Sequence, residues 1–221
     1  IILKYPYLKK LNVANNMKIS NVNHLKDLEI LDANYDIIAK KFSTEQLKFL
    51  IQNKKNYGIK DSSIKECTKL KWLDVSYNPE ITTVNHLTCL EILYAKSSGI
   101  GDTGILACTN LKYLDASRNT KITTVNHLPH LENLNASFNN ALNDNGIKEC
   151  TKIKSLCISG NNNITTINHL KELEILVAAN NCGIRDNGIK ECTKIQYLDV
   201  SGNIGITDVN HLVNLEYLNA K

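Results

Sequence analysis

The sequence predicts an α/β fold, a solenoid of about ten turns in which short parallel strands stack into one sheet. The first observation is a block of 20 residues, Thr109–Leu128, that recurs from Thr68, Thr151 and Thr193, with a looser copy from Pro6. A block that returns at a fixed period indicates a solenoid, because each repeat buries its apolar face against the next. The second observation is that two kinds of repeat alternate, both 20 to 22 residues long. That spacing makes neighbouring strands parallel.

An apolar frame within each repeat locates the expected strands. In the block above, the frame consists of Leu111, Leu114 and Ala116, and Asn119 follows it. Each frame is expected to contribute one short strand of the sheet. Ten such frames begin at Leu8, Leu28, Leu70, Leu90, Leu111, Leu131, Ile153, Leu173, Ile195 and Leu215.

The two kinds of repeat differ in how they end. The shorter kind ends in Val/Ile-Asn-His-Leu, as at Val125–Leu128, and the longer kind ends at a cysteine. The longer repeats also carry Asp-x-Gly-Ile, beginning at Asp102, Asp144 and Asp186. An aspartate before a short apolar run is an N-cap signal, since its carboxylate accepts from the first free N–H groups of a helix. One or two helical turns are therefore expected there, on the side away from the sheet.

The frame with its trailing asparagine, Leu111-x-x-Leu114-x-Ala116-x-x-Asn119, resembles the leucine-rich repeat, and the resemblance covers nearly the whole chain. The longer repeats are similar to the cysteine-containing repeats of F-box leucine-rich-repeat proteins, and the shorter ones to internalin repeats. The resemblance implies a curved solenoid, with its sheet on the concave face and with loops and short helical turns on the convex face. No segment matches an F-box, so a ubiquitin-ligase function does not carry over.

One stretch interrupts the array, which is otherwise expected to form a single solenoid domain over residues 1–221. Residues 37–57 do not follow the frame. Ser43-Thr-Glu-Gln46 has the pattern of a capping box, and Phe42 with Leu47 that of a hydrophobic staple. We favour an inserted helix at about 44–54; a degenerate turn is the alternative. Both ends of the chain fall inside a repeat, so we expect a fragment of a longer array.

Composition argues against several classes of partner. The net charge of +4 arises from 26 Lys and Arg against 22 Asp and Glu, with no run of one sign, so nucleic-acid binding is not expected. No segment approaches the roughly 18–20 apolar residues that span a bilayer, so no membrane contact is expected either. Nothing in the sequence suggests a small-molecule substrate.

The seven cysteines indicate a reducing environment. Four of them recur with the longer repeats, at Cys67, Cys108, Cys150 and Cys192. Equivalent atoms two turns apart are about 10 Å apart, beyond the Cα separation of about 7 Å that a disulfide tolerates. We interpret them as small buried hydrophobes and expect an intracellular, cytoplasmic protein.

Stacking turns the repeat into columns of equivalent residues, which we interpret as structural. An asparagine column follows the frames, where each amide can bond loop backbone with both of its ends. The residue after each first frame leucine alternates between Lys and Glu, which favours a ladder of opposite charges that fixes the register. The asparagine column consists of Asn16, Asn78, Asn119, Asn139, Asn161, Asn181 and Asn203.

No catalytic or metal-binding constellation emerges. The histidines of Asn-His-Leu recur about 10 Å apart, too far to share one ion, and only His127 and His130 stand at i and i+3, without a third ligand. We find no Gly-x-Ser-x-Gly and no P-loop. Every candidate Cys or His belongs to a periodic column, whereas a catalytic site must be singular. We therefore expect no enzyme, no cofactor and no metal.

The remaining candidate is the concave face, where side chains between the strand leucines point to solvent. The only tryptophan, several tyrosines and an arginine gather there around the third to sixth turns, and such residues are enriched in interface hot spots. The alternative is that strands simply favour aromatic residues. We expect a protein or peptide partner on this face; the runner-up is the recognition arm of a larger protein whose activity lies elsewhere. The predicted contact residues are Trp72, Ile92, Tyr94, Tyr113, Arg118, Phe138 and Tyr77.

Overall fold

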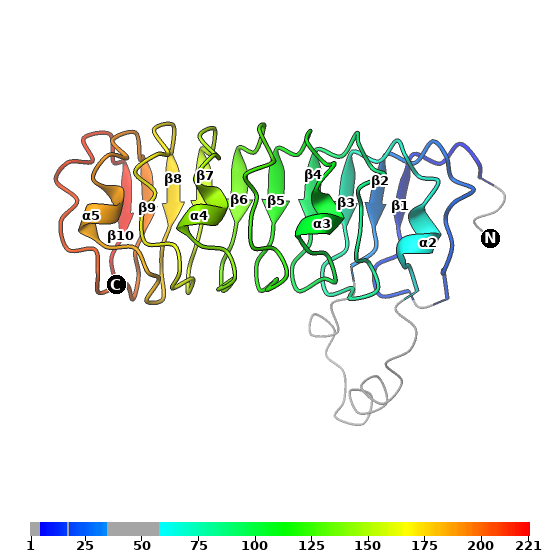
Figure 1. The fold of residues 1–221 in the computed structure, drawn as a ribbon, viewed down its shortest axis with the longest axis horizontal. Helices are drawn as coiled ribbons and strands as arrows, with labels where there is room; N and C mark the ends of the chain where they lie inside the picture. The colour runs from blue at the N-terminus through cyan, green and yellow to red at the C-terminus, as the bar shows by residue number, and fades with distance from the viewer. Residues whose placement is uncertain (1–4, 17, 35–57) are drawn as a thin grey trace, which may run out of the picture. The chain divides into compact units, whose positions relative to one another are not determined.

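The structure is a computed structural model that describes residues 5–16, 18–34 and 58–221. It contains two compact units, Ile1–Cys108 and Thr109–Lys221. Each unit is a stack of turns, one strand to a turn (Figure 1). The helix expected at about 44–54, within the irregular stretch 37–57, lies outside the described residues. The expectation of a single domain over 1–221 stays a prediction.

All ten expected strands are present among the described residues, and each begins two residues after the start of its frame. Within each unit they pair in parallel and follow sequence order, with the second frame leucines opposite one another, as Leu11, Leu31, Leu73 and Leu93 are in the first unit. The prediction of a parallel-sheet solenoid is confirmed. The strands are β1 (Lys10–Asn12), β2 (Ile30–Asp32), β3 (Trp72–Asp74) and β4 (Ile92–Tyr94), then β5 (Tyr113–Asp115), β6 (Asn133–Asn135), β7 (Ser155–Cys157), β8 (Ile175–Val177), β9 (Tyr197–Asp199) and β10 (Tyr217–Asn219).

The frame explains the core of each unit. Side chains alternate between the two faces of a strand, so the central leucine of each strand points inward and its two neighbours point outward. Leu73 and Leu114, at the centres of β3 and β5, are fully buried. The apolar residues of the return loop, such as Ile122 and Val125, are fully buried as well. Each turn thus closes around its own leucines and packs against the turns beside it.

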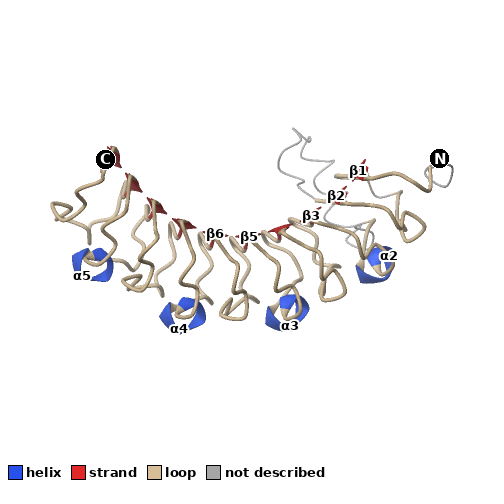
Figure 2. Cartoon of the chain, turned by 90° about the horizontal axis from the view of Figure 1, so that it is seen from above, coloured by secondary structure: helices blue, strands red, loops and turns tan. Residues whose placement is uncertain are grey.

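Among the described residues, four single-turn helices lie on the opposite side of the turns from the strands (Figure 2). They are α2 (Asp61–Ile64), α3 (Asp102–Ile105), α4 (Asp144–Ile147) and α5 (Asp186–Ile189). The helical turns expected at Asp-x-Gly-Ile are present. The pattern Asp-x-Gly-Ile does not predict α2, because a serine, Ser63, stands there in place of the glycine. None of the helices in the described part of the chain has the length or apolar character of a bilayer span.

The role assigned to the aspartates of these helices was wrong. The N-cap is the residue before the aspartate, as at Asn143, whose side chain accepts from the backbone N–H of Gly146. Asp144 is the first helical residue, and its carboxylate accepts from the backbone N and the hydroxyl of Thr165 in the following turn, at 2.7 and 2.6 Å. Asp61 and Asp186 bind Thr82 and Thr207 in the same way. The carboxylate therefore ties two turns together and does not cap its own helix.

The Asn-His-Leu motif ties each turn to both of its neighbours. The amide of Asn126 donates to the carbonyl oxygen of Asn145 at 2.7 Å and accepts from the backbone N of Glu149 at 3.1 Å, and so spans α4 in the following turn. The ring Nε2 of His169 lies 3.0 Å from the carbonyl oxygen of Ile147 in the preceding turn. His86 and His211 make the same contact, so these three histidines have a structural role.

The repeating cysteines are buried, as expected, and they also form hydrogen bonds. The thiols of Cys67, Cys108, Cys150 and Cys192 donate to carbonyl oxygens of an earlier turn at 3.3 to 3.4 Å. Burial raises the pKa of the Cys150 thiol to about 12 and that of the other three to about 11. All seven cysteines, each within the described residues, are free thiols.

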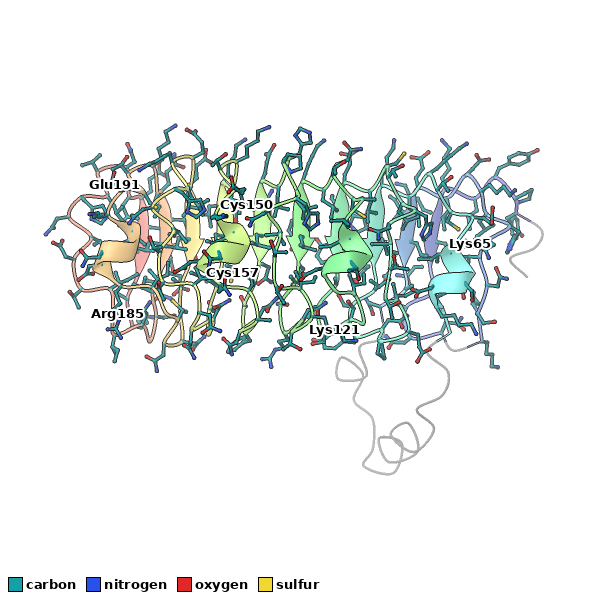
Figure 3. All side chains as sticks on the ribbon, viewed as in Figure 1. Lys65, Lys121, Cys150, Cys157, Arg185 and Glu191 are labelled. Carbon is teal, nitrogen blue, oxygen red and sulfur yellow. The ribbon has the colours of Figure 1, made fainter. Side chains whose placement is uncertain are left out.

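The alternating charges meet in ion pairs across adjacent strands. In the first unit, Glu29 lies 3.1 Å from Lys9 and 4.0 Å from Lys71; in the second, Glu132 lies 3.3 Å from Lys154. These side chains are more than one-third exposed, so solvent screens each pair and its contribution to stability is small. Other charged side chains, such as Lys65 and Arg185, project into solvent (Figure 3).

Candidate functional site

The sheet face is the surface formed by the outward-pointing residues of the strands and of the bends that follow them. Two residues of each strand point outward, one on either side of the buried leucine. The predicted contact residues lie on this face in two groups, one in each unit.

In the first unit, the aromatic group centres on Trp72. Ile30 and Ile92 stand opposite Trp72 on the two adjacent strands, and Tyr94 stands diagonally from it on β4. The Trp72 and Tyr94 ring centroids are 5.5 Å apart, with the rings tilted by 52°. All four side chains are half-buried, so they pack on one another while keeping one side open to solvent. Trp72, Ile92 and Tyr94 are thus brought together.

Tyr77 lies at the bend that follows β3 and has a φ of 61°. Its backbone N donates to the carbonyl oxygen of Lys96 at 2.7 Å, and the ammonium of Lys96 lies 5.1 Å from the centre of its ring. A bulky residue in the left-handed region is uncommon, and it is held there by contacts with the neighbouring turn. The left-handed bend directs the ring toward Lys96.

In the second unit, Arg118 and Phe138 occupy the equivalent bends, with φ of 53° and 55°. The guanidinium carbon of Arg118 lies 4.6 Å from the centre of the Phe138 ring, a cation–π contact. On its other side the Phe138 ring covers Gly160, where any side chain would collide with it. Phe138 is 40% exposed. Tyr113 lies on β5, opposite Asn133 on β6, and is half-buried.

A second aromatic group was not chosen from the sequence. The rings of Tyr197 and Tyr217, on β9 and β10, stack with centroids 4.5 Å apart at an angle of 6°. Ile175 stands opposite Tyr197 on β8 and is 41% exposed. These residues have the same frame positions as Trp72 and its neighbours. Their shared frame position was the signal in the sequence that could have identified this group, which lies outside the third to sixth turns.

The asparagine column bonds loop backbone with both ends of its amides. Asn161 is fully buried; its Nδ2 donates to the carbonyl oxygens of Asn139 and Leu142, and its Oδ1 accepts from the backbone N of Asn163 and Ile164. Asn78, Asn119, Asn139 and Asn203 are buried at the same point of their turns.

Asn181 does not belong to this column. Its side chain is exposed, and it has a φ of 52° directly after Asn180, whose φ is 58°. This turn makes its bend with two left-handed residues, so the buried place moves one residue along the chain. Cys182 fills that place, with its thiol donating to the carbonyl oxygen of Ala178 at 3.1 Å. The buried position is thus one residue later than the spacing predicts.

Within the described residues, no three His, Cys, Asp or Glu side chains are grouped so that they could hold a metal ion. His127 and His130 are not joined there by a third ligand. The side chains on the sheet face offer ring surfaces, amides and a few charges, which can bind another molecule by burial, hydrogen bonding and charge pairing.

No protein-family model matches the chain, and no curated protein matches it either. Solved structures do. An internalin from Listeria monocytogenes has a TM-score of 0.67 at 21% identity, over 100% of this chain and 69% of its own. A leucine-rich-repeat protein of Leptospira interrogans has a TM-score of 0.65 at 19% identity, over 100% of this chain and 62% of its own.

A third similar structure is the mouse RP105/MD-1 complex, with a TM-score of 0.64 at 17% identity, over 94% of this chain and 36% of the matched chain. The identities are low, and the similarity concerns the fold. It agrees with the ten frames, the parallel strands in sequence order and the buried asparagines found at the same point of successive turns. The chain has the leucine-rich-repeat fold.

Proposed function

We propose that this chain is a non-catalytic scaffold that binds a protein or peptide partner on its sheet face. The observation that carries the proposal is the group of Ile30, Trp72, Ile92 and Tyr94. Its side chains stand on three adjacent strands and contribute nothing to the buried file of leucines. Aromatic residues that share one open surface are the usual anchors of protein interfaces.

The similar structures support a protein partner as the ligand class. Mouse RP105 was solved as a complex with MD-1, and it has the same fold. The seven free thiols support a reducing, intracellular location, because cysteines in this number pair in oxidising compartments. The periodic placement of the histidines and most cysteines supports a binding role over catalysis.

The test compares Trp72→Ala with Tyr94→Ala, combined in one chain, against Leu106→Ala. Leu106 follows α3 on the other side of the turns and is 59% exposed, so it is a matched apolar control. The double variant should lose the partner that the intact chain captures from its native lysate, by about 30-fold or more in affinity. Leu106→Ala should leave capture unchanged.

Thermal unfolding of both variants accompanies the capture. The double variant should unfold near the wild-type temperature, because both rings are partly open to solvent. The proposal would be contradicted if the double variant folded and still captured the partner while Leu106→Ala did not. The binding site would then lie on the helix side of the turns.

A further inference from the structure

The sheet face of the first unit joins an apolar row to a pair of carboxylates. Ile30, Trp72 and Ile92 form one row across β2, β3 and β4, and Asp32, Asp74 and Tyr94 form the next. Adjacent strands lie about 4.8 Å apart, so the two carboxylates are immediate neighbours, with Trp72 beside them on the same strand as Asp74. Like charges placed directly opposite one another destabilise a sheet.

No cation of the described chain neutralises this pair. Asp32 accepts from the amide of Asn12 at 2.6 Å, and Asp74 accepts from the amide of Asn34 at 3.1 Å and from the backbone N of Ser76 at 2.8 Å. All of these donors are neutral. Burial, with the nearby charge of Asp74, raises the pKa of Asp32.

The neighbouring charges are directed elsewhere. Lys10 on β1 stands opposite Ile30, in the apolar row, and the ammonium of Lys96 lies over the Tyr77 ring. Glu29 is paired with Lys9 and Lys71. The surface thus has an apolar part and a negative part side by side, and none of the described residues supplies its negative part with a counter-charge.

We propose that this surface binds an arginine side chain of a protein partner, with an apolar residue of the same segment placed over Ile30, Trp72 and Ile92. The proposal rests on the proposed function, for which it names the chemistry of the partner. A guanidinium can donate to both carboxylates at once and lay its plane against an aromatic ring. A lysine ammonium has no planar fork, so arginine fits this combination better than lysine.

The test begins with selection of linear peptides from a displayed random library on the intact chain. Peptides that contain arginine next to an apolar residue should be enriched. Their binding is followed through the emission of Trp72, the only tryptophan of the chain. Replacing the arginine by citrulline, its neutral isostere, should weaken binding at least about tenfold, and replacement by lysine should weaken it less.

The matched protein variants are Asp32→Asn with Asp74→Asn, combined, and Asp199→Asn alone. Asp199 has the same place in its frame on β9, where its carboxylate accepts from the backbone N of Ser201 at 2.9 Å. The double variant should bind the arginine and citrulline peptides equally, and Asp199→Asn should behave as the wild type. The citrulline comparison needs no protein variant, so it holds even where Asp32→Asn or Asp74→Asn impairs folding.

The outcomes separate this inference from the proposed function. Peptides that change Trp72 emission but lack arginine, or that bind the double variant unchanged, overturn the arginine proposal and leave the protein-binding face intact. If the selection yields no peptide that changes the emission of Trp72, the arginine proposal is overturned. The proposed function is a separate question, and it fails only if the variant that combines Trp72→Ala with Tyr94→Ala still captures the partner as the wild type does.

Discussion

The amide of Asn203 donates to the Sγ of Cys182 over 3.1 Å, in a column where the partner is otherwise loop backbone. The same amide reaches the carbonyl oxygen of Ala178 at 2.9 Å. Cys182 stands at the buried place that asparagine fills in five other described turns and Ser98 fills in the turn of β4. The thiol fills the buried place because the preceding bend contains two left-handed residues, Asn180 and Asn181.

The asparagine column provides a matched pair of variants. Asn161→Ala leaves buried loop groups without their partner and should lower the free energy of unfolding by about 1–3 kcal/mol. Asn181→Ala, at the equivalent frame position but exposed, removes no buried partner and should lower it by about 1 kcal/mol or less, because only its left-handed φ of 52° favours asparagine over alanine. Urea unfolding of the two variants measures both. Equal urea midpoints for Asn161→Ala and Asn181→Ala would contradict the conclusion that Asn181 lies outside the buried asparagine column.

The aspartate of α4 should stabilise the packing of two turns. Asp144→Ala removes the acceptor for the backbone N and hydroxyl of Thr165, and should lower the free energy of unfolding by about 1–2 kcal/mol. Asn145→Ala changes the next residue, whose side chain is exposed, and should have an effect within about 0.5 kcal/mol. Were Asp144 only a local helix signal, amide exchange at Thr165 would be the same in both variants.

The glycine of Asp-x-Gly-Ile should tolerate no side chain. A Cβ at Gly188 would collide with the carbonyl oxygen of Thr165 in the neighbouring turn, so Gly188→Ala should cost about 1–3 kcal/mol. A Cβ at Gly202 would make only ordinary van der Waals contact with the backbone of Asn180, but the residue has a φ of 65°, so Gly202→Ala should cost about 1 kcal/mol from backbone conformation alone. Thermal unfolding compares the two. A larger loss of stability in Gly202→Ala than in Gly188→Ala would show that backbone conformation, and not the close approach of the neighbouring turn, determines the cost of a side chain.

The buried thiols should make stability fall at high pH. An unfolded thiol ionises near pH 9, whereas the folded Cys67, Cys108 and Cys192 ionise at about 11. Their contribution is complete below pH 9 and is lost between pH 9 and 11, because only the unfolded state releases its protons there. Urea midpoints at pH 8 and 10.5 measure the loss, which should be smaller in Cys108→Ala.

The same burial predicts an order of alkylation. Cys89 is exposed and should react first with iodoacetamide in the native protein, while Cys67, Cys108, Cys150 and Cys192 should react only on unfolding. Peptide mass mapping after a short labelling pulse identifies the modified thiol. Early labelling of Cys150 would contradict the packing of its turn.

The strands could be predicted because a single frame specifies each of them, and its inward leucines leave one possible register. The burial of Cys182 in place of Asn181 could not be predicted, because residue spacing does not reveal that the bend of this turn contains one more residue. The helices were expected from Asp-x-Gly-Ile, but the reach of Asp144 to Thr165 depends on how adjacent turns stack. For the same reason, the sequence placed Trp72 and Tyr94 on one face but could not show that Asp32 and Asp74 stand side by side next to Trp72.

The left-handed bends after the strands have a further consequence. At Tyr77, Arg118, Phe138 and Gly202 the backbone N–H donates to a carbonyl oxygen of the next turn, whatever the side chain is. The bend is therefore specified by the main chain, and a bulky residue there costs only about 1–2 kcal/mol. Mutation can exchange ring, guanidinium or hydrogen at this position while the leucine file stays as it is, except where a neighbouring ring fills the space, as Phe138 does over Gly160. The side chains that a unit presents on its sheet face can thus change one bend at a time while its turns stay folded.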